Sequence, residues 1–448
     1  MSHYLLKPPN IMTIPKGIPY IIGNELAERF SFYGMKTILV VFMTKYLMDQ
    51  SGAMDVMKRE EALTWYHLFN SGVYITPILG ALIADGILGK YKTIITLSIV
   101  YCLGHLVLSM DDTRLGLSIG LGLIAMGSGG IKPCVSAHVG DQFGKTNSHL
   151  LEKIFSWFYF SINLGAFFST LATPLLLDKF GPNLAFGIPG LLMFIATFVF
   201  WLGRREFIHI PPGKINFIKE VFSKKGLNAL GRLTIIYIFV AIFWSLYDQT
   251  GSSWVLQADH MNRHWLGVEW LPSQIQAVNP ILILIFIPSF NYLIFPYVGK
   301  YVTLTPLRKI SFGLFLTSPS FFIIGHAQSL IDLGMSVSIY WQIIAYIIIT
   351  AAEVLVSITC LEFSYSQAPR TMKSIIMSYF FLSVALGNLV TAGVNVFIQN
   401  PDGSLKVQGP EYFYFFGILM FFTAILFSII SRYYKPVSYF QKEENEFL

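Results

Sequence analysis

Charged residues are scarce in this sequence. Only 12% of its 448 residues are Asp, Glu, Lys or Arg, whereas a soluble globular protein carries about 25%. Hydrophobic residues make up 54% of the chain. A soluble core of this length cannot bury so much apolar surface, so the surplus is expected to face lipid. The composition indicates an integral membrane protein and disfavours soluble enzymes, disordered scaffolds and nucleic-acid binders.

Cysteine is rare and recognisable catalytic motifs are missing. The three cysteines, Cys102, Cys134 and Cys360, lie far apart in apolar segments without metal-ligand spacing. The sequence contains no H-E-x-x-H or G-x-S-x-G motif. Its first residues also lack a short apolar run that ends at a cleavage site, so the first spanning helix is expected to act as the insertion signal. We expect no disulfide framework, metal site, cofactor or enzymatic activity.

Long apolar stretches are abundant instead. Twelve of them are long enough to cross about 30 Å of hydrocarbon, which needs about 20 helical residues. They cover residues 19–46, 62–84, 92–110, 115–137, 154–177, 186–203, 232–250, 273–298, 309–327, 338–363, 374–398 and 411–432. The sequence therefore predicts an all-α membrane protein with twelve transmembrane helices.

The positive charges indicate how these helices are oriented. If the N-terminus is cytoplasmic, the cytoplasmic segments hold 21 of the 31 Lys and Arg residues and the outer segments hold seven. The remaining three, 31 − 21 − 7, lie inside predicted helices. Because cytoplasmic loops are enriched in Lys and Arg, we expect a multi-pass protein of the cell membrane with both termini in the cytoplasm. The modest net charge of +6 gives no support for nucleic-acid binding.

The longest cytoplasmic connection, residues 204–231, separates six helices from six. We therefore expect an N-terminal bundle at 1–203, a linker at 204–231 and a C-terminal bundle at 232–448. Transporters built from two such bundles bind substrate near the midplane, between the halves. Apolar and charged residues alternate between 215 and 225, which suits either a helix on the anionic inner leaflet or a solvated linker.

Several ionisable residues fall inside the predicted helices. Each costs about 2.5 to 3.5 kcal/mol on insertion scales and is by default a functional candidate. They are Glu25, Glu28, Arg29, Lys36, His67, Lys132, Asp248, Glu353 and Glu362. Helical spacing places Glu25, Glu28 and Arg29 on neighbouring positions of one face. We expect ion pairs across a cavity lined by the first, fourth, seventh and tenth helices. The alternatives are pairs that only lock helices together, snorkelling of Lys36 and Glu362, and a helix-packing role for His67.

Glycine and proline accompany two of these sites. Gly127, Gly129, Gly130 and Pro133 surround Lys132, and Pro280 and Pro288 lie in the eighth helix. Such residues permit local unwinding beside a cavity or close packing of helices through small side chains. Both interpretations stay open from the sequence.

The first helix carries a recognisable pattern. Its run Glu25-Leu-Ala-Glu28-Arg29-Phe30, followed by Phe32-Tyr33-Gly34, resembles the E-x-x-E-R-F-x-Y-Y-G motif of proton-coupled oligopeptide transporters, a branch of the major facilitator superfamily. Further matching segments are 74–85 with 89–90, 129–136, 158–166, 243–249, 276–280 and 353–369. The resemblance extends over nearly the whole chain and implies the major facilitator fold of two six-helix bundles.

The resemblance also implies a peptide site. It places Arg29 and Lys132 at the carboxyl end of the peptide, and Asn163, Asn279 and Glu353 at its amino end and backbone. An aromatic wall would come from Phe30, Tyr33, Tyr74 and Trp244. A zwitterion needs a cationic pole, an anionic pole and amide partners between them, and these residue types supply all three.

Proton coupling is implied at Glu25, Glu28, His67 and Glu353, and an outer gate at Lys36 and Asp248. One departure is Phe380, where relatives often have Trp. Two others are a linker too short for the helix pair that bacterial relatives insert, and the lack of the large extracellular domain of animal relatives.

These features together predict a symporter that imports di- and tripeptides with protons by alternating access, as a monomer and without a cofactor. A symporter for another small substrate, such as an amino acid, nitrate or a peptide-like drug, stays open. A membrane enzyme or receptor that has kept the fold is a more distant alternative.

Overall fold

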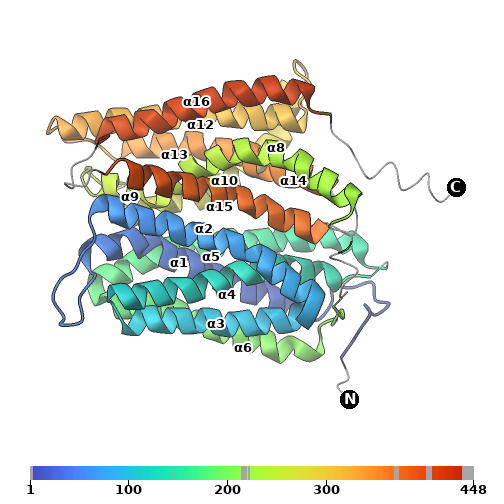
Figure 1. Ribbon diagram of the computed structural model, residues 1–448. Helices are drawn as coiled ribbons and strands as arrows, with labels where there is room; N and C mark the ends of the chain where they lie inside the picture. Colours follow the sequence, from blue (N-terminus) through green and yellow to red (C-terminus); the bar gives the residue numbers. More distant parts are fainter. Residues whose placement is uncertain are drawn as a thin grey trace. The chain divides into compact units, whose positions relative to one another are not determined.

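The computed structural model describes residues 4–144, 146–212, 219, 222–367, 373–399 and 406–435. Its described elements are helices apart from one small hairpin (Figure 1). The first half contains α1 (Ile18–Lys45), α2 (Arg59–Ile83), α3 (Lys90–Met110), α4 (Arg114–Asp141), α5 (Leu151–Phe180) and α6 (Pro182–Leu202). A π-helical turn at Ala84–Leu88 extends α2.

The second half begins with α8 (Lys224–Tyr247) and the short α9 (Ser253–Ala258). Strands β1 (His264–Trp265) and β2 (Val268–Glu269) form an antiparallel hairpin. The remaining helices are α10 (Val278–Ser289), α11 (Phe295–Val298), α12 (Pro306–Asp332), α13 (Tyr340–Glu353), α14 (Thr359–Ser366), α15 (Lys373–Phe397) and α16 (Pro410–Tyr433).

Eleven helical segments of the described chain are long and apolar enough to cross a membrane. The 28-residue α1 is also long enough, but its interior carries Glu25, Glu28, Arg29 and Lys36. The predicted all-helical membrane fold is therefore confirmed. Most predicted helix bounds agree to within a few residues. The predicted start at 232 is wrong, because α8 begins at Lys224; polar residues such as Lys224 and Asn228 end a hydrocarbon span but do not end a helix.

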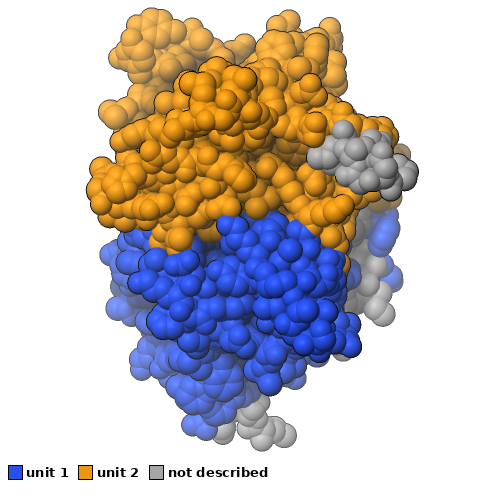
Figure 2. Space-filling model, turned by 90° about the vertical axis from the view of Figure 1, so that its left-hand side faces the viewer, with its two compact units in different colours: residues 1–57, 72–223 blue, residues 58–71, 224–448 orange. Residues whose placement is uncertain are grey.

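Residue contacts divide the chain into two compact units. Unit 1 contains residues 1–57 and 72–223, and unit 2 contains residues 58–71 and 224–448 (Figure 2). The division falls inside α2, so the first half of this helix, with His67, packs with the C-terminal elements. Most of the predicted amphipathic stretch at 215–225 lies outside the described residues.

In unit 1, α1 packs against α5 and α6, while α3 packs against α4 and α6. The α4 glycines permit a close approach to α2. A Cβ on Gly129 would lie 1.8 Å from the Thr76 hydroxyl, and one on Gly80 would lie 2.0 Å from the Gly130 carbonyl. Of the two interpretations that the sequence left open, local unwinding of α4 does not occur, because α4 continues through Pro133 to Asp141. Close helix packing is the interpretation that the structure confirms.

In unit 2, α12 lies beside α13 and α16, and α8 beside α15 (Figure 1). Helical geometry changes on both sides of the half-buried carboxyl site that includes Asn279 and Glu353. A 3₁₀ turn (Pro272–Ala277) precedes α10, and π-helical turns follow Pro288 and Glu353. Near Pro280 and Pro288 the helix therefore changes to 3₁₀ and π-helical turns instead of unwinding fully. Such turns alter the direction of side chains without exposing unpaired backbone groups to lipid.

Candidate functional site

An acid–base cluster forms the centre of α1. The Arg29 Nε donates to Glu25 Oε1 at 2.6 Å and lies 3.3 Å from Glu28 Oε2. Both glutamate side chains are only 2% exposed, and the arginine side chain is 11% exposed. The spacing that the sequence indicated therefore forms a buried triad. One cation faces two carboxylates, so a proton bound to either acid would bring the triad to net neutrality.

A hydroxyl from α4 completes the environment of Glu28. The Ser128 Oγ donates to Glu28 Oε1 at 2.9 Å, and Ser128 is fully buried. This bond joins α4 to α1, the helix that carries both Glu28 and Arg29. Charged hydrogen bonds of this kind are shorter and stronger than neutral ones. Ser128 therefore fixes the position of the Glu28 carboxylate.

Lys132 lies over two aromatic rings. Its Nζ lies 3.9 Å from the centre of the Phe32 ring and 4.6 Å from that of the Tyr74 ring. The lysine is 9% exposed. Cation–π contacts stabilise a desolvated ammonium, so the two rings fix the position of the Lys132 side chain in the interior of unit 1. Tyr74 was expected in the aromatic wall and lies here.

The other predicted residues of unit 1 are Asn163, Tyr33 and Lys36. Asn163, on α5, is 8% exposed, and its Nδ2 donates to the Tyr159 carbonyl of its own helix at 3.0 Å. Its carboxamide oxygen is the atom that faces outward from that bond. Tyr33 and Lys36 are half-buried on α1, and the Tyr33 ring packs edge-on against Phe32.

Unit 2 supplies a half-buried carboxyl group. The Asn279 Nδ2 on α10 donates to Glu353 Oε2 at 2.8 Å and contacts the Thr350 hydroxyl at 3.1 Å. Glu353 is the last residue of α13, directly before the π-helical turn at 354–358. The structure thus brings together two residues that the sequence assigned to one peptide end.

His67 belongs to a hydrogen-bonded chain in unit 2. Its Nδ1 lies 2.7 Å from Asn388 Oδ1, and its Nε2 lies 3.0 Å from the Ser252 hydroxyl. The Asn388 Nδ2 donates both to Asp248 Oδ2 at 2.7 Å and to the Val384 carbonyl at 3.0 Å. Because both amide protons are used, Asn388 Oδ1 accepts, and His67 Nδ1 carries a proton. Asn388 therefore joins His67 to Asp248.

Trp244 forms an aromatic cluster with Phe243, Tyr247 and Phe380. It is 8% exposed, and its ring lies 6.4 Å from the Phe380 ring, edge to face. The buried indole Nε1 has no hydrogen-bond partner among the described residues. Phe380, where relatives often have Trp, is itself packed against Tyr237. Although the Phe380 ring is smaller than the Trp of relatives, it still packs against Trp244.

Sequence reasoning missed the uncharged partners of the charged groups. Ser128, Thr350 and Asn388 lie in apolar helices and Ser252 lies in the turn before α9. The residues selected for their cost inside a membrane were all ionisable, so these four were passed over. Asn388 carried the clearest signal, because a buried amide in a membrane helix is costly without partners. Glu362 is exposed on α14. Among the residues that the structure describes, no group of three His, Cys, Asp or Glu side chains is arranged to hold a metal ion.

Long apolar helices that enclose ion-paired and hydrogen-bonded charges are those of a multi-pass integral membrane protein. A family model described as the POT family matches residues 91–225 and 223–410, so the chain belongs to the POT family. It is 39% identical over 356 residues to Peptide transporter family 1 of Drosophila melanogaster, covering 69% of this chain and 47% of that protein. The chain spans about half the length of the curated relatives it matches.

Solved structures agree over nearly the full chain. The in meso crystal structure of the POT family transporter PepTSo has a TM-score of 0.85 and 37% identity, over 94% of this chain and 99% of that one. A crystal structure of a proton dependent oligopeptide (POT) family transporter has a TM-score of 0.77 and 37% identity, over 92% and 100% of the two chains. The two-bundle major facilitator fold is thereby confirmed.

Proposed function

We propose that this protein is a proton-coupled symporter that imports di- and tripeptides by alternating access. The observation that carries the proposal is the buried contact of Arg29 with Glu25 and Glu28, inside the motif that the chain shares with its family. A charge triad that is one proton short of neutrality is suited to bind a proton in one conformation and release it in another.

The peptide would be held by opposite charges from the two units. Arg29 and Lys132 would bind the peptide carboxylate, and Glu353, positioned by Asn279, would bind the amino group. Asn163 would meet the peptide backbone, while Tyr33, Tyr74 and Trp244 would contact side chains without strict direction. The cation–π seat of Lys132 and the Asn279–Glu353 hydrogen bond support these roles.

The proton would act at Glu25, Glu28, Glu353 and His67, and the outer gate would use Lys36 and Asp248. The hydrogen-bonded chain from His67 through Asn388 to Asp248 supports this part of the proposal. Protonation of His67 would change the charge beside Asp248 and so bias the gate between two packings. No metal or cofactor enters the mechanism.

The remaining expectations also belong to the proposal. We infer that both termini are cytoplasmic, that the protein resides in the cell membrane and works as a monomer, and that residues 1–203 and 232–448 act as two bundles joined by the linker 204–231. The excess of Lys and Arg on one set of loops supports this orientation.

Transport by the purified protein in liposomes tests the function. We expect an inside-negative, outside-acid gradient to drive accumulation of a labelled dipeptide, and unlabelled di- and tripeptides to compete while free amino acids and nitrate do not. A protonophore should abolish accumulation but preserve counterflow exchange. Uptake that ignores the protonophore would refute proton coupling, and competition by nitrate or amino acids alone would refute the peptide assignment.

A further inference from the structure

An open apolar groove between α3 and α6 on unit 1 plays no part in the proposed transport. It encloses about 610 Å³. Side chains that are each 48% to 61% exposed form its walls, namely Ile99, Leu103, Leu106, Leu191, Phe194 and Phe198. Because the chain spans a membrane, this surface faces hydrocarbon rather than water.

The groove has the length of a lipid tail. Its α3 lining runs from Ile95 to Ser109, which corresponds to about 21 Å of helix at 1.5 Å per residue. This exceeds half of the bilayer hydrocarbon core of about 30 Å. One acyl chain from a single leaflet therefore fits along the groove.

One end of the groove is basic. Trp201 lines this end, and the Arg204 guanidinium stacks over its ring at 3.7 Å. Arg204 also acts electrostatically on Tyr91 at the start of α3, and the neighbouring Lys92 and Arg205 are exposed. Glu206 offsets one of the charges, so the end keeps a net positive charge. The opposite end is lined by Ser109 and Gly187, which carry no charge.

We propose that this groove binds an anionic phospholipid. One acyl chain lies between α3 and α6, and the phosphate lies against Lys92, Arg204 and Arg205. Tryptophan suits this boundary, because its ring is amphipathic and favours the headgroup level. The charge selects an anionic headgroup over a zwitterionic one, since basic clusters at the membrane surface attract anionic lipids. The proposal does not depend on the transport function.

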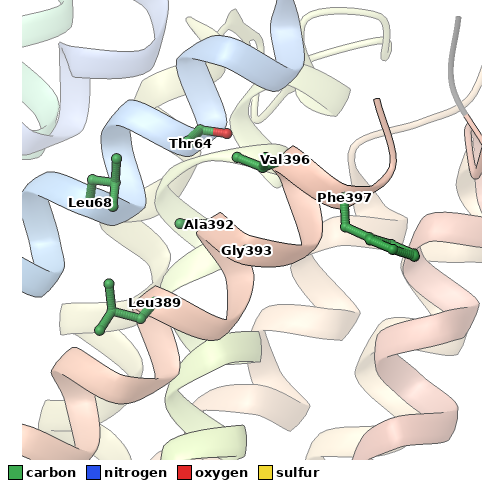
Figure 3. Close-up of a pocket in the computed structure, with 7 residues that line it drawn as sticks. All are labelled: Thr64, Leu68, Leu389, Ala392, Gly393, Val396 and Phe397. Atoms are coloured by element: carbon green, nitrogen blue, oxygen red, sulfur yellow. The ribbon is translucent and has the colours of Figure 1, made fainter. Parts of the chain in front are cut away.

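A second groove offers a comparison within the same molecule. It lies between α2 and α15 of unit 2, encloses about 430 Å³ and is lined by apolar side chains that include Leu68, Leu389 and Val396 (Figure 3). The one cation that contacts its lining among the described residues is Lys406, whose Nζ lies 4.3 Å from the Phe397 ring and already donates to the Phe397 carbonyl. This groove should bind lipid tails without selecting their headgroups.

Native mass spectrometry tests the proposal on the purified full chain. The protein is equilibrated with equal amounts of phosphatidylglycerol and phosphatidylcholine of identical acyl chains, and the retained lipids are counted. We expect preferential retention of one phosphatidylglycerol. The triple variant Lys92→Gln, Arg204→Gln, Arg205→Gln should reduce its retention at least about tenfold. The matched control Lys300→Gln, Arg308→Gln, Arg432→Gln removes three exposed cations of unit 2 and should retain it as the parent does.

A second variant tests the groove itself and leaves every charge in place. Leu191→Trp fills the α3–α6 groove and should also displace phosphatidylglycerol, whereas Leu389→Trp in the α2–α15 groove should not. Equal retention of the two lipids by the parent protein would overturn the proposal, as would unchanged retention in the triple variant. Unchanged retention in Leu191→Trp would place the lipid outside the groove and overturn it as well.

Discussion

At the scale of single residues, the charged groups of this protein depend on uncharged partners. Ser128 on α4 donates to Glu28, and Asn388 on α15 connects His67 to Asp248. Each partner holds an acid or a histidine in place with a hydrogen bond, because a buried polar group is costly without one. Proton coupling should therefore respond to substitutions that change no charge.

Ser128→Ala tests the first of these contacts. A hydrogen bond to a charged group contributes about 1.5 to 3 kcal/mol. Loss of the donor removes one contact from the buried Glu28 carboxylate, so gradient-driven peptide uptake should fall at least about fivefold relative to counterflow exchange. The groups that face Glu28 are Arg29 and Glu25 on α1, Lys132 on α4 and Tyr101 on α3, and all of them stay in place.

Gradient-driven uptake and counterflow exchange in liposomes give this ratio. Ser128→Thr should restore the parental value, because it keeps the hydroxyl. Ser136→Ala is the matched control on the same helix, since the Ser136 hydroxyl bonds only to its own helix at the Pro133 carbonyl. An unchanged ratio in Ser128→Ala would show that this hydrogen bond plays no part in coupling at Glu28.

Asn388→Ala tests the second contact. It removes the acceptor of His67 and a donor of Asp248 inside a region that excludes water, which should lower stability by about 1 to 3 kcal/mol. Proton-driven uptake should fall more than counterflow, because the link between the histidine and the gate is lost. Asn395→Ala, two turns along α15, removes a similarly buried amide that bonds to Tyr412 and should affect both assays equally. If Asn388→Ala lowered proton-driven uptake and counterflow by the same factor, the role of Asn388 would be structural only.

At the scale of helices and segments, close approach and docking control stability. The α2–α4 contact depends on glycines with no room for a side chain, whereas Gly122 on the same helix has open space around its Cβ position. Backbone atoms can approach this closely only where Cβ atoms are missing. The two kinds of glycine on α4 should therefore behave in opposite ways.

Gly129→Ala should destabilise the protein and Gly122→Ala should not. The added methyl group at 129 would collide with the Thr76 hydroxyl and the Val73 carbonyl, at a cost of about 1 to 3 kcal/mol for an overpacked core. At position 122 the substitution removes the entropic cost of glycine and should be neutral or stabilising. Thermal unfolding in detergent, followed by the fraction that remains monodisperse, measures both. Matching thermal midpoints would contradict the close-packing account.

The N-terminal segment docks on unit 1 beside a histidine outside the membrane. The His209 backbone amide donates to the Leu5 carbonyl at 2.7 Å, and its ring stacks on Tyr4 at 4.2 Å. Partial burial, with a smaller contribution from the nearby Lys92, lowers the pKa of His209 from its ordinary value of 6.5. His209 therefore binds a proton more readily when the segment is released than when it is docked. Docking should be strongest above pH 6.5 and should weaken as the pH falls toward the lowered pKa.

Hydrogen exchange of the amides in residues 4–13 at pH 7.5 and 5.5, corrected for intrinsic exchange rates, measures this docking. We expect lower protection at pH 5.5 in the parent and no such pH dependence in His209→Gln. Identical pH dependence in the two proteins would assign the effect to another group.

At the scale of the whole molecule, coupling requires that the charge state of the interior biases one conformation over another. Glu25→Gln keeps the size of the side chain and its ability to accept from Arg29, but it removes the site at which a proton could bind. Gradient-driven uptake should therefore fall at least about tenfold, while counterflow exchange should stay within about threefold of the parent. Glu411→Gln, at the exposed start of α16, is the control for loss of a carboxylate. A parallel loss of both activities in Glu25→Gln would mean that Glu25 holds the structure or the substrate rather than the proton.

The sequence by itself determined the membrane class, the number of long helices and most of their ends. Hydrocarbon thickness and the cost of a buried charge act on each helix separately. The composition and spacing of one segment are therefore enough to predict that the segment spans the membrane and where it ends. The Arg29–Glu25–Glu28 triad was predictable for the same reason, because its members lie within one or two turns of α1.

Only the tertiary structure decided which helices meet and which uncharged side chains face the charges. Ser128 lies 100 residues from Glu28 and Asn388 lies 321 residues from His67, and no local pattern in the sequence encodes such distances. The glycines of α4 were open to two interpretations until α2 was placed against them. The groove between α3 and α6 likewise exists only once two helices far apart in the sequence pack together with their exposed apolar faces side by side.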